Sequence, residues 1–183
     1  GSQDPFWLLP IGAKIVAINR QKHKFRLHFG TGLRPFFLLQ YDGDKLGFNI
    51  SMVITNYGDG CFRLQSGEVS VLIDPEGNRL KADLTIFTSA DIKEAPEDDP
   101  TVIRMPGEYE VDGIEVDGAQ AVADSGGDKI KTCYLIRMED IKVAVLGQIS
   151  LEPSADVYER LEEPDIVILP IDKQNYLSGE LAA

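Results

Sequence analysis

Few side chains in this sequence are suited to nucleophilic or metal chemistry. The 183 residues include two histidines, His23 and His28, and two cysteines, Cys61 and Cys133. The histidines lie five residues apart on a candidate hairpin, where a strand would point them to opposite faces, so we expect no metal site built from histidine alone. Two cysteines cannot form a disulfide framework, and we interpret both as reduced, buried thiols of a cytoplasmic protein.

Sequence motifs for catalysis or phosphate binding are also missing. No serine lies in a Gly-x-Ser-x-Gly motif, and neither cysteine has a histidine placed by a sequence signature. The glycines within residues 124–128 are more typical of a hairpin loop than of a phosphate-binding or dinucleotide-binding loop. The sequence therefore predicts no catalytic residue of these classes.

The composition predicts a folded, acidic protein. Hydrophobic residues make up 43% of the chain, enough for the core of one domain or of one domain with a small appendage. No apolar run approaches the ~20 residues of a membrane-spanning helix, so we expect no membrane contact. The net charge of −12 and the pI near 4.5 argue against a nucleic-acid-binding surface over the whole protein.

The charge divides the chain into segments. Residues 1–50 contain seven Lys or Arg and three acidic residues, whereas residues 51–183 contain 11 and 27. This break predicts a basic, β-hairpin-rich extension over 6–51 and an acidic domain over 52–183. Residues 1–5, Gly-Ser-Gln-Asp-Pro, are typical of an expression-vector remnant and are set apart from the fold.

The extension contains two candidate hairpins. The runs Lys14–Asn19 and Lys24–Phe29 are β-branched or aromatic and are expected to pair across a polar turn. The runs Phe36–Tyr41 and Lys45–Ile50 flank Asp42-Gly43-Asp44, and Asp-Gly between apolar runs is a strong hairpin signal.

The acidic segment alternates short apolar runs with turn residues, which predicts a strand-rich α/β (α+β) fold. One clear helix is expected over Ser154–Glu163, with Ser154 as its N-cap and Pro164 after its end. A polar loop is expected over Ser89–Pro100. The expected strands are Val53–Asn56, Cys61–Gln65, Val69–Asp74, Leu84–Thr88, Val102–Arg104, Glu108–Val111, Ile114–Val116, Ala119–Val122, Thr132–Met138, Lys142–Leu146 and Ile166–Ile171.

Several of these runs, taken in order, resemble metallo-β-lactamase-fold hydrolases, and most closely the branch that includes the ascorbate-6-phosphate lactonases. The resemblance begins with the strand and turn Met52–Leu64 and covers roughly residues 52–175. In that branch the initiator methionine stands just before this strand, so residues 6–51 are an addition to the family pattern. The other phrases that carry the resemblance are Val71–Pro75, Pro106–Gly113, Tyr134–Ile136, Val145–Gly147 and Asp165–Pro170.

The resemblance implies a four-layer αβ/βα sandwich, in which one or two metal ions, zinc in the family, activate water for hydrolysis at the loop ends of the strands. The family's ligands are a His-x-His-x-Asp-His phrase, a later histidine, an aspartate after a glycine, and a C-terminal histidine. This chain matches one half of that fold and ends before the region of the last histidine. We therefore expect a partial sandwich with a β-rich N-terminal extension.

At the positions that match the family's pocket, this sequence has other residues. Ser89, Asp91 and Glu94 stand where histidines are expected in the first phrase, and Lys93 stands at its aspartate. The remaining positions are Asp59, where histidine is common in this branch, Ala123, at the later histidine, and Gln148, at the bridging aspartate.

Two functions remain open. The first is a non-catalytic binding or structural protein without a cofactor, in which Lys93 pairs with a neighbouring acid and replaces the ion electrostatically. The second is a metal-dependent hydrolase of phosphoesters or lactones, in which Asp59, Asp91 and Glu94 hold Mg²⁺ or Ca²⁺ through oxygen ligands. Because a shortened fold would leave an apolar face uncovered, we also expect a homodimer.

Overall fold

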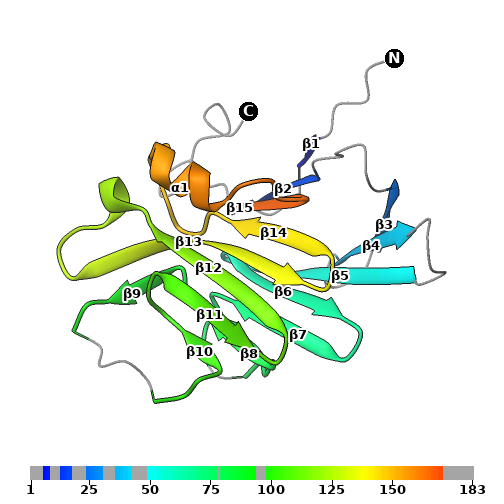
Figure 1. Cartoon of the computed structure of the whole chain (residues 1–183), viewed down its shortest axis with the longest axis horizontal. Helices are drawn as coiled ribbons and strands as arrows, with labels where there is room; N and C mark the ends of the chain where they lie inside the picture. The colour runs from blue at the N-terminus through cyan, green and yellow to red at the C-terminus, as the bar shows by residue number, and fades with distance from the viewer. Residues whose placement is uncertain are drawn as a thin grey trace.

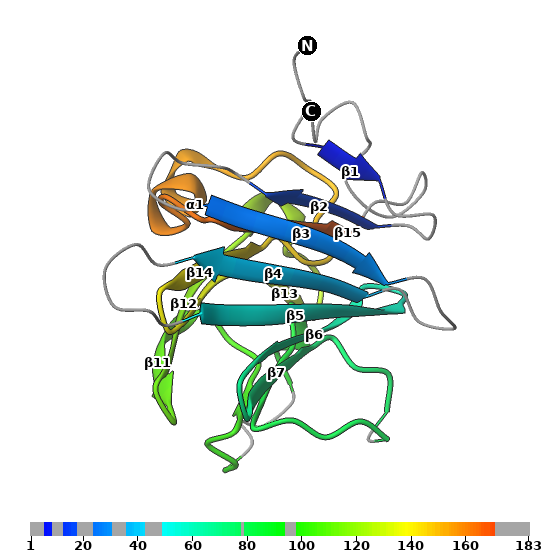
Figure 2. The ribbon, with the colours of Figure 1, turned by 90° about the vertical axis from the view of Figure 1, so that its right-hand side faces the viewer.

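The computed structural model describes residues 6–8, 13–17, 24–30, 36–42, 49–77, 79–93 and 98–170. These residues form two β-sheets, and a short helix, α1 (Ala155–Arg160), packs on one of them (Figure 1, Figure 2). In the described part of the chain, no helix has the length and hydrophobicity needed to span a bilayer.

The first sheet has seven strands in the order β10-β8-β7-β6-β5-β4-β3. Strands β3 to β7 pair in antiparallel fashion, whereas β8 pairs in parallel with both β7 and β10. The bounds are β3 (Lys24–Gly30), β4 (Phe36–Asp42), β5 (Asn49–Gly58), β6 (Cys61–Ser66), β7 (Val69–Ile73), β8 (Leu84–Ile86) and β10 (Val102–Ile103).

The second sheet has the order β1-β2-β15-β14-β13-β12-β11, and β9 pairs with the start of β13. It is also mixed, since β14 and β15 are parallel and the other pairs are antiparallel. The bounds are β1 (Phe6–Leu8), β2 (Ala13–Ala17), β9 (Ser89–Asp91), β11 (Gly107–Val111), β12 (Ile114–Gln120), β13 (Lys129–Met138), β14 (Ile141–Val145) and β15 (Ile166–Pro170), with a 3-10 turn η1 (Val122–Asp124) after β12.

The core lies in two clusters on the two faces of the second sheet. On the inner face, Tyr134 and Ile136 of β13 pack in one cluster with residues of the first sheet such as Leu64. On the outer face, Cys133 joins a second cluster that includes Val157 of α1. The middle of β13 is therefore buried on both faces, which explains why Cys133–Ile136 are apolar in succession rather than in alternation.

The described part of the chain thus contains two mixed sheets and one helical layer. This confirms the coarse prediction of a strand-rich sandwich with both α and β elements. The four-layer arrangement that the resemblance implies is present only in part, because the described residues include a single α-helix.

The strands of the extension join both sheets. Strand β4 pairs in antiparallel fashion with the strand that follows it, as predicted, but Asp42 lies opposite Asn49. The partner of Phe36–Tyr41 is therefore within Asn49–Gly58 rather than the predicted Lys45–Ile50, and residues 43–48 lie outside the described residues. The first predicted hairpin is wrong: β2 pairs with β1 and β15, whereas β3 pairs with β4 in the other sheet. One of the partners of β2, strand β15, comes from a distant part of the chain, which local turn signals do not show. One continuous strand, β5, crosses residues 51 and 52.

Two further predictions of local structure are corrected. The run from Ile114 to Gln120 is one strand, although the sequence predicts two strands, Ile114–Val116 and Ala119–Val122, with a turn at Asp117-Gly118 between them. Gly118 instead allows the Tyr134 ring to lie close to the backbone of β12, because a Cβ at this position would come within 2.7 Å of that ring. The expected polar loop begins with strand β9, whose three residues pair with β13.

The helix is shorter than predicted. It spans Ala155–Arg160, and Leu161 is its C-cap, so it ends before Glu163 and does not need Pro164 to stop it. Ser154 stands at the predicted N-cap position, but its side chain makes no capping hydrogen bond.

Candidate functional site

The predicted pocket positions that the structure describes do not gather into one set of metal donors. Asp59 lies in the exposed turn between β5 and β6. The Asp91 carboxylate accepts a hydrogen bond from the Lys93 backbone N–H (3.0 Å), as in an Asx turn. Glu94 lies outside the described residues. Across the described ranges, no group of three or more His, Cys, Asp or Glu side chains could hold a metal ion.

Lys93 does pair with an acidic residue, but the pair lies on the surface. Its ammonium is 2.7 Å from the Asp128 carboxylate, and the two side chains are 74% and 58% exposed. Water screens an ion pair this exposed, so the contact stabilises the fold little. Lys93 therefore supplies no buried positive charge.

A first polar cluster lies where β7 and β8 end. The carboxylate of Asp74 is buried and accepts hydrogen bonds from the backbone N–H (2.7 Å) and the hydroxyl of Thr88. The Thr88 hydroxyl oxygen accepts one in turn from the Gln148 backbone N–H (3.3 Å). Burial raises the pKa of Asp74 to about 6, and the hydrogen bonds from Thr88 and Gln148 oppose part of that rise.

Gly147 allows the loop after β14 to approach this cluster. Its φ is 65°, in the left-handed region, and a Cβ on it would overlap the side chain of Thr88. Both the backbone conformation and the packing therefore require glycine here. In this way Gly147 brings Gln148, one of the predicted pocket positions, against Thr88.

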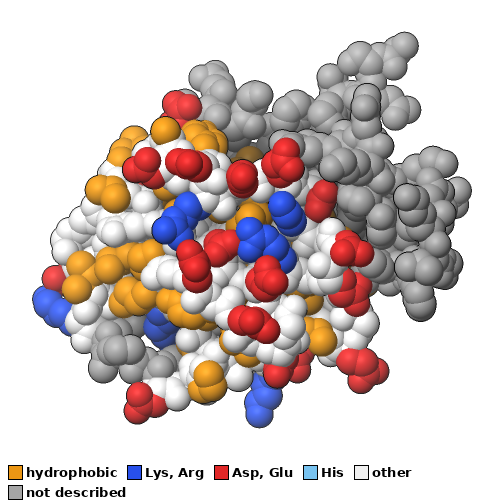
Figure 3. Space-filling model, in the orientation of Figure 1, with side chains coloured by type: hydrophobic (Ala, Val, Ile, Leu, Met, Phe, Trp, Pro, Cys, Tyr) orange, Lys and Arg blue, Asp and Glu red, His pale blue; other side chains and the backbone are white. Residues whose placement is uncertain are grey.

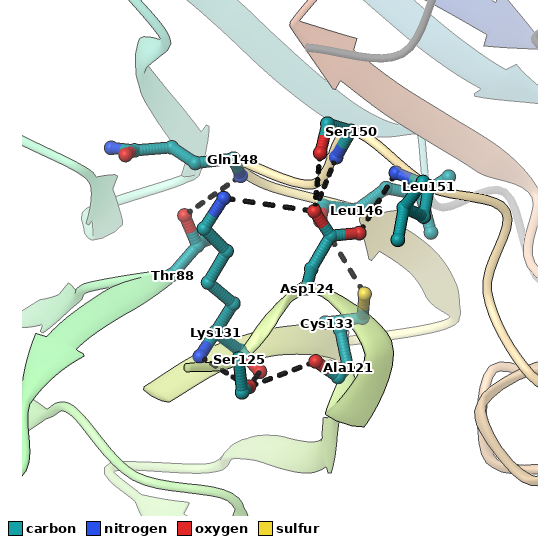
Figure 4. A network of polar contacts seen from close by, with 10 residues as sticks. All are labelled: Thr88, Ala121, Asp124, Ser125, Lys131, Cys133, Leu146, Gln148, Ser150 and Leu151. Atoms are coloured by element: carbon teal, nitrogen blue, oxygen red, sulfur yellow. Dashed lines mark hydrogen bonds and ion pairs between the residues drawn. The ribbon is translucent and has the colours of Figure 1, made fainter. Parts of the chain in front are cut away.

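A second polar cluster joins η1 to the same loop (Figure 4). The Asp124 carboxylate accepts hydrogen bonds from the Ser150 N–H (2.8 Å), the Ser150 hydroxyl (2.6 Å) and the Leu151 N–H (2.8 Å). Lys131 Nζ lies 3.7 Å from Asp124 Oδ1, and the two side chains are 23% and 4% exposed. Burial raises the pKa of Asp124, but the hydrogen bonds and the Lys131 charge outweigh it and hold that pKa below its usual range.

Strand β13 and its neighbours position Lys131. The Ser125 hydroxyl oxygen accepts a hydrogen bond from the Lys131 N–H (3.0 Å), and the same hydroxyl donates to the Ala121 carbonyl (2.8 Å). In the pairing of β9 with β13, Lys131 lies directly opposite Ser89. The lysine therefore stands across from the position where the resemblance implies the first histidine ligand.

Sequence reasoning missed most members of these clusters, among them Thr88, Asp124 and Lys131. Thr88 precedes Ser89, and Asp124 follows Ala123, so both adjoin predicted pocket positions along the chain. Lys131 has no such neighbour, and only the register of β9 on β13 brings it there.

The two thiols are not nucleophiles at neutral pH. Burial raises the pKa of Cys61 to about 11 and that of Cys133 to about 12, and nearby carboxylates add to both shifts. Both cysteines are buried and free of disulfides, as predicted. The Cys133 Sγ donates a weak hydrogen bond to the Leu146 carbonyl (3.4 Å).

The described residues at the predicted pocket positions do not fit a zinc ion. Zinc sites in proteins take three or four ligands from Cys, His and carboxylate side chains, whereas Ser89, Ala123 and Gln148 supply a hydroxyl, a methyl and an amide. Two carboxylates that contact or adjoin this region, Asp74 and Asp124, already accept hydrogen bonds from protein donors. The described surface also has a cavity of about 300 Å³ between α1 and the β11–β12 pair, but none of the predicted pocket positions lines it.

Comparison with known proteins assigns the fold. A family model for the beta-lactamase superfamily domain matches residues 53–183. Among solved structures, the chain is similar to a Thermotoga maritima protein described as a proposed Zn-dependent hydrolase of the metallo-beta-lactamase superfamily. The identity is 21% and the TM-score 0.52, with 72% of this chain and 67% of that chain covered. At this identity the likeness shows the fold alone. No curated protein matches the chain.

Proposed function

Because the chain belongs to the beta-lactamase superfamily, we propose that it is a degenerate member that keeps the fold but acts as a non-catalytic binding or structural protein. One observation carries this proposal. The loop over residues 147–151 is held by the Thr88 hydroxyl and by the Asp124 carboxylate with its lysine, not by a set of metal donors. Hydrolysis in this superfamily needs an ion that activates water.

The alternative is a hydrolase with a rebuilt carboxylate site, and the described residues offer it little support. Asp59 lies in an exposed turn, and the Asp91 carboxylate is engaged with the backbone of its own turn. Oxygen-only sites for Mg²⁺ or Ca²⁺ need several carboxylates or carbonyls around one point. This hydrolase is therefore the outcome that would contradict the proposal.

Metal content and hydrolysis, measured on the same preparation, test the proposal. The full chain is incubated with Zn²⁺, Mn²⁺, Mg²⁺ or Ca²⁺, desalted and analysed by elemental analysis. Hydrolysis is then assayed with a chromogenic phosphodiester and a simple lactone, the substrate classes of the branch it resembles. We expect less than about a tenth of an equivalent of each metal, since the described residues include no group of donors that could retain it. We also expect no turnover above the metal-free buffer.

A specific outcome would overturn the proposal. In that outcome the wild type binds about one equivalent of metal and hydrolyses a substrate. Asp91→Ala loses both the metal and the activity, whereas Asp98→Ala keeps both. Asp98 is an exposed acid of the same segment and serves as the matched control.

A further inference from the structure

We propose that the ammonium of Lys131 fills the structural role that a metal ion has in this fold. The ammonium pairs with the Asp124 carboxylate, and Asp124 in turn holds the loop over residues 147–151. The inference rests on the proposed function, because a chain that still bound metal at this place would have no need of a resident cation.

The position of Lys131 supports this assignment. Lys131 lies opposite Ser89 across the β9–β13 pair. Its partner Asp124 directly follows Ala123 in η1, and the donor Ser150 lies two residues after Gln148. Three positions that match family ligands thus adjoin members of one polar cluster. Figure 4 shows the lysine reaching from β13 toward Asp124, on the side where Thr88 and Gln148 lie.

Electrostatics give a reason for a cation at this place. The Asp124 side chain is only 4% exposed, and a buried carboxylate is costly unless hydrogen bonds and an opposite charge compensate it. Ser150 and Leu151 supply three donors but no charge. The distance of 3.7 Å from Lys131 Nζ to Asp124 Oδ1 is longer than a hydrogen bond, so the lysine acts mainly through its charge.

This cluster also links three separate elements. Lys131 comes from β13, Asp124 from η1, and Ser150 from the loop after β14. A metal ion stabilises a fold by cross-linking groups that are distant in the sequence, and the ion pair with its hydrogen bonds makes a cross-link of the same kind. The link would be permanent, because it needs no ion from solution.

The test compares two lysines of the same region in the full chain. Lys131→Met removes the charge but keeps most of the length of the side chain, and Lys93→Met removes the exposed partner of Asp128 as the matched control. We expect Lys131→Met to lower Tm by about 4–8 °C and the control by less than about 2 °C, given the low value of exposed pairs. Equal shifts for the two variants would overturn the inference.

Charge reversal gives a second readout, specific for the replacement of a metal. Lys131→Glu places a second carboxylate beside Asp124, and we expect millimolar Mg²⁺ or Ca²⁺ to recover part of its lost Tm. Neither the wild type nor Lys93→Glu should respond to these ions by more than about 1 °C, since their carboxylates are paired or solvated. Two results would overturn the inference. In the first, the ions raise the Tm of the wild type as much as that of Lys131→Glu. In the second, they do not raise the Tm of Lys131→Glu at all.

The inference and the proposed function can fail separately. If the wild type carries stoichiometric metal and hydrolyses a substrate, the proposed function falls, whatever the lysine variants do. If the wild type is free of metal and Lys131→Met behaves like Lys93→Met, only the role of Lys131 falls.

Discussion

Burial and hydrogen bonding act in opposite directions on the Asp74 carboxyl group. The Asp74 carboxyl group binds its proton more tightly in the folded chain than in the unfolded chain, because burial raises its pKa from 3.8 to about 6. The contribution of the protonated Asp74 carboxyl group to stability is therefore fully present below about pH 4 and is lost as the pH rises through about 6. A shift of this size corresponds to roughly 2–3 kcal/mol.

Asp74→Asn should remove this pH dependence. The amide keeps the shape of the side chain and cannot ionise, so the variant should gain stability relative to wild type between about pH 4 and pH 6, by roughly 2 kcal/mol. Urea unfolding midpoints from pH 4 to 8 measure the difference between the two curves. Parallel curves for variant and wild type across this window would show that Asp74 ionises normally.

Asp83→Asn is the matched control with the opposite sign. Hydrogen bonds from the Ser70 N–H and hydroxyl lower the pKa of Asp83, an exposed residue. Its contribution is present above the unfolded pKa and is lost as the pH falls through the folded one. The control should therefore differ most from wild type at neutral pH and converge with it in acid.

Helix α1 owes its stability to packing rather than to capping. Its six residues are too few for a helix that is stable by itself. Val157 is 1% exposed and packs, with Leu161, in the cluster on the outer face of the second sheet. Ser154 has the extended backbone of an N-cap, yet its hydroxyl makes no capping bond. The apolar face of the helix is thus the feature that fixes its place.

Two substitutions separate packing from capping. Val157→Ala should lower the free energy of unfolding by about 2 kcal/mol, because it removes buried methyl groups and leaves a cavity. Ser154→Ala should cost less than about 0.5 kcal/mol, since no capping bond is lost. Chemical denaturation of both variants measures the two values. A cost of about 1 kcal/mol or more for Ser154→Ala would mean that the hydroxyl does cap the helix in solution.

At the scale of the molecule, the N-terminal strands take part in both sheets. Strand β2 lies beside β15, and β4 lies beside β5, so the edges of these two strands are paired within the chain. Exposed apolar side chains remain elsewhere: Val122 of η1 is 69% exposed, and Leu151 and Tyr158 are about half exposed. Figure 3 shows hydrophobic side chains among acidic ones around α1.

The homodimer expected from the sequence remains a prediction. Light scattering coupled to gel filtration at micromolar concentration should give twice the chain mass of 20.2 kDa. Leu151→Glu should shift the protein toward the monomer if the apolar side chains near α1 form the contact, because a charge buried between copies is costly. A wild-type mass of one chain at that concentration would contradict the prediction.

The sequence alone indicated the strand-rich fold, and it predicts that the family's ligands are replaced. Both are local properties: apolar alternation along a segment marks a strand, and the residue at Ser89, Ala123 or Gln148 can be read directly. The same local signals failed where a partner was distant. They paired β2 with β3, and they interpreted Gly118 as a turn residue although it makes room for the Tyr134 ring.

Only the tertiary structure shows which groups lie beside the predicted pocket positions. No pattern in the sequence relates Lys131 to Ser89, because the register of β9 on β13 depends on contacts between strands far apart in the chain. The burial of Asp124 likewise depends on a loop that follows it by more than twenty residues. Charge compensation acts through space at distances of a few ångströms, so the chemistry of this site follows from packing rather than from the order of residues.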